Sequence, residues 1–95
     1  MTYSELAMTF DILAKHKPGE TVMMDWSEDE WGIDLNDFEL SPSEIRMLAE
    51  MGWLLGSDDG EEMKAWYEPK TASDEELVEI FNQYKSIYLI NQFIF

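Results

Sequence analysis

Carboxylates are the side chains whose number and spacing could do chemistry in this chain of 95 residues. There are 21 Asp and Glu residues against 6 Lys and Arg residues, which gives a formal net charge of −15. Between Glu20 and Glu62 there are 14 acids and one base, Arg46, so this segment alone carries a charge of −13. Because self-repulsion of this size opposes a compact state, the charge requires either a solubility role or a partner that offsets it.

Catalysis and metal binding are the first two uses of carboxylates to test. Paired carboxylates hydrolyse glycosides only across a cleft, and acids placed in short turns and helix caps leave little room for one. Residues 57–62 resemble a calcium loop superficially, but Gly60 in the sixth position puts Leu55 where the first carboxylate ligand belongs. The adjacent acids at 28–30 lack the spacing of a metal cage. We therefore expect no enzymatic activity, no catalytic residue, no metal ligand and no cofactor.

His16 is the single histidine of the chain and the remaining candidate for a general base. It lies between two lysines at the end of an expected helix, with no Ser or Cys nearby in sequence. This placement favours a structural role, a cation at the negative end of the helix dipole.

Recognition by a protein partner is the third use of carboxylates. A strand rises ~3.3 Å per residue, close to the ~3.4 Å axial spacing of phosphates along one DNA strand. Carboxylates on hairpins and their turns can therefore imitate a track of phosphates. The acids predicted to bind a partner are Asp25, Glu28, Asp29, Glu30, Asp34, Asp58, Asp59, Glu61 and Glu62. The alternative, that the charge serves only solubility, remains open.

The acidic runs Asp25–Glu30 and Ser57–Glu62, with the small size and the absence of cysteine, resemble small acidic phage-encoded inhibitors. These are the anti-CRISPR and anti-restriction proteins, several of which mimic DNA. The likeness covers the composition of the central half of the chain, so no residue role is carried over from it. It implies stoichiometric blocking of a basic nucleic-acid-binding groove, for example in a CRISPR effector or a restriction enzyme of the host cell.

Composition also restricts the compartment and the domain organisation. Negative charge argues against direct binding to nucleic acid or to anionic membranes, and no apolar run approaches the ~20 residues that span a bilayer. Without cysteine there are no disulfides or thiolate metal sites, and no basic start followed by an apolar stretch indicates a secretory signal. At 45% hydrophobic residues the chain is too apolar for a disordered acidic tail. We expect residues 1–95 to form one cytoplasmic domain.

Three helices are predicted from capping boxes and helical spacing. The first runs from about Tyr3 to Lys17 and buries apolar residues spaced as in a helix. The second has a proline at its first position and ends at a glycine. The third follows residue 73 and extends through residue 88. The three capping pairs are Thr2 with Glu5, Ser41 with Glu44, and Ser73 with Glu76. The predicted buried positions of the first helix are Leu6, Phe10 and Leu13, and those of the third are Leu77, Phe81, Tyr84 and Tyr88.

Two hairpins complete the expected fold. In the first, over 22–35, Trp26 opposite Trp31 places Met24 opposite Ile33 and gives one apolar face. The second joins 53–56 to 61–67, with its register left open between two turn types. The order α-β-β-α-β-β-α with an antiparallel sheet is that of a compact single-domain α+β protein.

The apolar end of the chain supports a second functional hypothesis, a small structural or assembly protein. Residues 87–90 and 93–95 are dense in apolar side chains that would be an aggregation hazard if exposed. They either fold over the core or associate with a second copy, so the chain is a monomer or a weak homodimer. We favour folding over the core.

Overall fold

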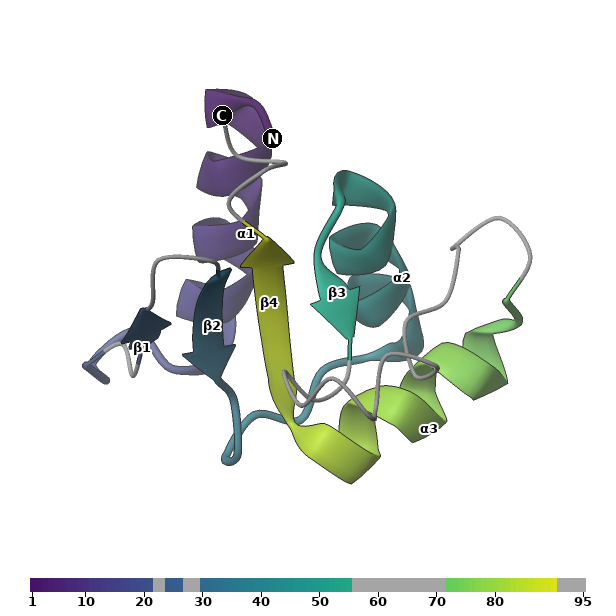
Figure 1. Cartoon of the computed structure of the whole chain (residues 1–95). Coiled ribbons are helices and arrows are strands. Elements are labelled where there is room, and N and C mark those ends of the chain that lie inside the picture. Colours follow the sequence, from purple (N-terminus) through teal and green to yellow (C-terminus); the bar gives the residue numbers. More distant parts are fainter. Residues whose placement is uncertain (22–23, 27–29, 56–71, 91–95) are drawn as a thin grey trace.

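A computed structural model describes residues 1–21, 24–26, 30–55 and 72–90 (Figure 1). The elements in chain order are α1 (Tyr3–His16), β1 (Met24–Trp26), β2 (Glu30–Asp34), α2 (Pro42–Met51), β3 (Leu54–Leu55), α3 (Asp74–Tyr84) and β4 (Ser86–Ile90). The strands form one antiparallel sheet in the order β1-β2-β4-β3. The predicted α+β class with an antiparallel sheet is confirmed.

Local side-chain chemistry determines where the helices begin. All three predicted capping boxes are present, with the Ser or Thr hydroxyl accepting from the glutamate N–H and the glutamate accepting in return. At α2, Glu44 N donates to Ser41 Oγ at 3.2 Å and Ser41 N donates to Glu44 Oε1 at 2.8 Å. The helix ends at Gly52, whose φ of 114° lies in the left-handed region that favours glycine.

The first hairpin has the predicted register. Met24 pairs with Ile33, and Trp26 pairs with Trp31. Residue 22 and the second half of the second hairpin lie outside the described residues. The first half of that hairpin is β3, whose residues Leu54 and Leu55 pair with β4.

The last described element differs from the prediction, because it is a strand and not the end of a helix. Helix α3 ends at Tyr84, since Lys85 adopts a left-handed conformation with φ of 53°. The next five residues form β4, so Tyr88 is a strand residue and the described order ends α-β. Helical spacing of Phe81, Tyr84 and Tyr88 suggested a longer helix, but a short apolar run rich in β-branched and aromatic residues fits a strand equally well.

The apolar run after residue 86 forms an interior strand of the sheet. β4 pairs with β2 on one side and with β3 on the other (Figure 1). Ile87 is 0% exposed and Leu89 is 4% exposed. For this part of the chain, the prediction that the apolar end folds onto its own core is confirmed. Residues 93–95 lie outside the described residues.

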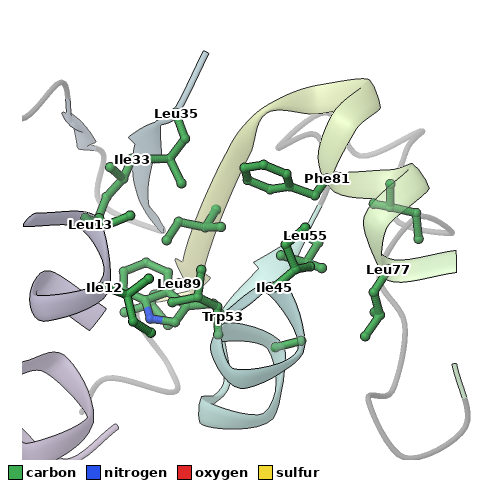
Figure 2. Packing of buried hydrophobic residues seen from close by; sticks show 14 of the residues in the cluster. Ile12, Leu13, Ile33, Leu35, Ile45, Trp53, Leu55, Leu77, Phe81 and Leu89 are labelled. Atoms are coloured by element: carbon green, nitrogen blue, oxygen red, sulfur yellow. The ribbon is translucent and has the colours of Figure 1, made fainter. Parts of the chain in front are cut away.

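The core lies on one face of the sheet, against the helices. Ile33 of β2 and Ile87 of β4 pack in one cluster with residues of all three helices (Figure 2). The helix residues of that cluster are Ile12, Leu13, Ile45, Leu48, Ala49, Leu77, Ile80 and Phe81. In Figure 1, α1 and α2 lie behind the sheet. The buried side chains of the core therefore lie between these helices and the strands.

Helix α1 confirms two of the three predicted core positions, since Leu13 is buried and Leu6 is partly buried against the core, but the third, Phe10, is wrong. Thr9, Ile12 and Leu13 are buried, whereas Phe10 is 40% exposed. The hydroxyl of Thr9 makes its burial possible, because it donates to Glu5 O at 2.9 Å and accepts from Trp53 Nε1 at 2.8 Å. The sequence pattern counts threonine as polar, so it left Thr9 out of the buried face of the helix. The next residue, Phe10, was predicted as core instead.

Candidate functional site

Asp34 is the predicted partner-binding acid whose side chain the structure describes. It is exposed at the end of β2, and its Oδ1 accepts a hydrogen bond from Asn36 N at 3.0 Å. Asp25 and Glu30 are placed as strand residues: Asp25 pairs with Gly32, and Glu30 pairs with Ile90. Along β2, Asp34 alternates with the buried Ile33, so its side chain lies on the sheet face away from the core. The six acids outside the described residues are Glu28, Asp29, Asp58, Asp59, Glu61 and Glu62.

A groove of about 450 Å³ adjoins Asp34, between the C-terminal half of α1 and the turn that follows β2. We call it the α1–β2 groove. Its apolar lining comes from both sides, with Phe10 and Leu13 on α1, Ile33 and Leu35 at the end of β2, and Phe38 after the turn. Figure 2 shows Leu13 and Ile33 close to one another in the core. Leu35 is 1% exposed, so the floor of the groove is part of the core.

Four charged residues are among those that line the groove. Glu20, Asp34 and Asp37 line it together with one base, Lys17. The Lys17 ammonium lies 3.5 Å from the Glu20 carboxylate and 6.0 Å from the centre of the Phe38 ring. Glu20 and Asp37 were not among the predicted partner-binding acids. Both fall within the acidic segment, but only the packing of α1 against β2 brings them to the same groove as Asp34.

Two of the described basic side chains, Arg46 and Lys85, hold elements together. Arg46 Nε donates to Asp74 Oδ1 at 2.6 Å and its Nη2 donates to Ala72 O at 2.6 Å, which ties α2 to the start of α3. Lys85 Nζ donates to Phe38 O at 2.9 Å. Because these cations are engaged in contacts within the chain, exposed carboxylates such as Asp37 make the surrounding surface negatively charged.

His16 contacts a carboxylate on another helix, which the sequence did not indicate. Its Nε2 lies 2.9 Å from Oε2 and 3.0 Å from Oε1 of Glu44, the capping glutamate of α2. Burial of this carboxylate raises its pKa, but hydrogen bonds from Ser41 N–H, from His16 and from the Ser41 hydroxyl together outweigh burial and lower the pKa. The contact agrees with a structural role for His16 and joins the end of α1 to the start of α2.

Among residues 1–21, 24–26, 30–55 and 72–90, no three acidic or histidine side chains gather in a way that could hold a metal ion. Within the same ranges, no helix has the length and apolar character needed to cross a membrane.

Comparisons with known proteins were made at three levels. No protein-family model, no curated protein and no solved structure matches this chain.

Proposed function

We propose that this protein is a non-enzymatic inhibitor that binds another protein through its carboxylates and blocks a basic surface used for nucleic acid. The observation that carries the proposal is the charge of −13 concentrated between Glu20 and Glu62. A CRISPR effector or a restriction enzyme in the cytoplasm of a host cell has a surface of the required charge. The carboxylates would occupy positions at lysines and arginines that phosphates otherwise fill.

Charge placement in the described residues supports this function. Asp34 and Asp37 are exposed beside a groove, whereas Arg46 and Lys85 are engaged in contacts within the chain. The same charge disfavours direct binding to nucleic acid, since phosphates would be repelled. A basic protein surface is therefore the partner that the electrostatics favour.

The alternative assembly role has less support. It required apolar residues near the C-terminus to dock onto another subunit, but Ile87, Tyr88 and Leu89 are buried in the sheet of their own chain. An association through these residues would require β4 to leave its place between β2 and β3.

The test begins with capture of the partner from a host lysate on the immobilised protein, followed by affinity measurements with the purified partner. Charge reversal by Asp58→Lys and Asp59→Lys should weaken binding by about tenfold or more at low salt, mainly through slower association. The loss should shrink as salt rises, because exposed charges are screened over ~10 Å at 0.1 M ionic strength.

The matched control reverses two exposed acids of α3, Glu75→Lys and Glu79→Lys, which lie outside the acidic segment. This control carries the same change in net charge and should bind nearly as tightly as the wild type. Association that is insensitive to salt, or equal losses in both double variants, would contradict binding through the acidic segment.

A further inference from the structure

Exposed apolar side chains gather on the two helices behind the sheet. Within the described residues, the large hydrophobic side chains that remain exposed are Tyr3, Met8 and Phe10 on α1 and Met47 on α2. Met8 is 44% exposed and Met47 is 39% exposed. These two methionines line a groove of about 510 Å³ where α1 meets α2, which we call the α1–α2 groove. Flexible methionine side chains at a surface suit contact with another protein.

Helical spacing shows which side of α1 carries the groove. Met8, Asp11 and Lys15 follow one another at intervals of three and four residues, so they lie along one side of the helix. All three residues are exposed and line the groove. Phe10 lies on the other side of α1, where it lines the α1–β2 groove. The exposed apolar side chains of α1 therefore form two separate patches.

The side of α2 that faces α1 is identified by its contacts. Glu44 contacts His16 at the end of α1, and Met47 lies three residues further along the same side of α2. Arg46 contacts the start of α3, and Glu50 lies four residues further along that other side. The exposed acid of α2 at position 50 is therefore turned away from the α1–α2 groove.

The charge at this groove is balanced, unlike that of the chain as a whole. Residues 1–19 hold two acids, Glu5 and Asp11, and two bases, Lys15 and Lys17, so they contribute nothing to the net charge of −15. Neither Asp11 nor Lys15 makes a hydrogen bond or an ion pair with another residue that the structure describes. The groove thus offers one acid and one base, both available to a partner.

This combination of charges favours a second copy of the chain as the occupant. Two copies of so acidic a protein repel each other over most of their surfaces, and the repulsion is smallest at a neutral face. Across a twofold axis, contacts occur in reciprocal pairs, so Asp11 of each copy can meet Lys15 of the other. A basic surface would instead be repelled by Lys15.

We propose that the α1–α2 groove is the interface of a weak homodimer with twofold symmetry. Asp11 of each copy pairs with Lys15 of the other, and Met8 and Met47 become buried between the copies. The side chain of Asp34 lies on the sheet face away from the helices, so it stays exposed in the dimer. The dimer goes beyond the proposed function and does not depend on it.

Sedimentation and light scattering on the full chain test for the dimer. The mean mass should rise from that of a monomer toward that of a dimer as the concentration approaches about 1 mM, because one side of two short helices buries little area. Added salt should favour the dimer, since it screens the repulsion between two copies of charge −15. A monomer up to about 1 mM, at low and at high salt, would overturn the proposal.

Charge variants test which residues meet. Asp11→Lys gives two bases on this side of α1 and Lys15→Asp gives two acids, so each variant alone should dimerise at least about tenfold more weakly than the wild type. An equimolar mixture of the two variants should regain the dimer, because each acid of one variant then meets a base of the other. Circular dichroism verifies that both variants fold. Failure of the mixture to recover, or dimers of wild-type affinity in either variant alone, would contradict the reciprocal pairs.

A neutral double variant tests the apolar part of the interface. Met8→Gln with Met47→Gln keeps the charge of the groove and should weaken the dimer by about tenfold or more through loss of apolar burial. The matched control is Phe10→Gln, which changes an exposed apolar residue on the other side of α1 and should stay within about twofold of the wild type. A larger loss in Phe10→Gln than in the methionine variant would place the interface elsewhere and overturn the proposal.

The outcomes for the dimer and for the inhibitory function can be separated with the captured partner. If Met8→Gln with Met47→Gln stays monomeric but displaces nucleic acid as well as the wild type does, the dimer and the function stand as independent properties. If the wild type dimerises through this groove but displaces no nucleic acid, the dimer stands and the function fails. If the wild type is a monomer and the same variant loses the captured partner, the groove binds that partner and the dimer proposal fails.

Discussion

At the scale of single residues, the buried pair of Thr9 and Trp53 shows how a polar group enters the core. Trp53 is 2% exposed and its indole N–H donates to Thr9 Oγ1 at 2.8 Å. The hydroxyl in turn donates to Glu5 O, so both polar groups are satisfied inside the protein. This bond connects α1 to the short link between α2 and β3.

Replacement of Thr9 by valine tests that bond. Thr9→Val keeps the shape of the side chain but leaves the indole N–H without its acceptor, so it should destabilise the fold by about 1–3 kcal/mol in chemical denaturation. Trp53→Phe with Thr9→Val should cost less than the sum of the single changes, since the two residues interact. The exposed control Thr21→Val should stay within about 0.5 kcal/mol of the wild type. A neutral Thr9→Val would contradict the assigned bond.

At the scale of elements, the helix starts depend on short-range chemistry that the structure displays at every cap. The side chain of Ser41 accepts from Glu44 N at the start of α2. Ser41→Ala should therefore cost about 1 kcal/mol of stability in thermal or chemical denaturation. Ser4→Ala, at the equivalent exposed position in the first turn of α1, is the matched control and should cost about 0.5 kcal/mol or less. Equal losses in the two variants would argue against the cap.

The lowered pKa of Glu44 makes one part of the stability depend on pH. Because the pKa of Glu44 is lowered in the fold, its ionised form contributes stability above its ordinary value of 4.5, and this is lost as pH falls through the folded pKa. Glu44→Gln should be less stable than the wild type near neutral pH, by about 0.2–1 kcal/mol as for an ion pair at the surface. The difference should shrink in acid.

Denaturation curves at several pH values measure that difference, with Glu50→Gln as the control for loss of one negative charge on the same helix. A constant difference between Glu44→Gln and the wild type from neutral pH down to about pH 3 would contradict the linkage to Glu44 ionisation.

The elements differ in how far the sequence predicts them. Caps such as Ser41 with Glu44 involve neighbours in sequence, and the alternation around Trp31 selects one hairpin register, so both were predictable. The strand at Tyr88 and the exposed position of Phe10 were not, because each depends on which distant element packs there. Burial of Thr9 requires Trp53, which lies 44 residues away.

Residues of the candidate site also differ in how far the sequence predicts them. The sequence shows the excess of carboxylates and led to Asp34, which the structure places at the rim of a groove. The partnership of Asp34 with Glu20, Asp37 and Phe10 arises only when α1 packs beside β2. No periodic pattern links residues so far apart along the chain.

At the scale of the whole molecule, the negative charge lies on the surface around a well-formed apolar core. The apolar side chains of three helices and the sheet form one cluster, while exposed carboxylates remain on the outside. Because the core can hold the chain together despite a net charge of −15, the surface is able to present carboxylates in fixed positions to a basic partner. Competition with phosphate for that partner is the central claim.

Competition is measured most directly by titrating this protein into a complex of the captured partner with labelled DNA or RNA. We expect the protein to displace the labelled nucleic acid as it reaches stoichiometric amounts. Displacement by the double variant Asp58→Lys with Asp59→Lys should be weaker than displacement by the control Glu75→Lys with Glu79→Lys. Simultaneous binding of the protein and the nucleic acid to the partner, with neither affinity reduced, would contradict it.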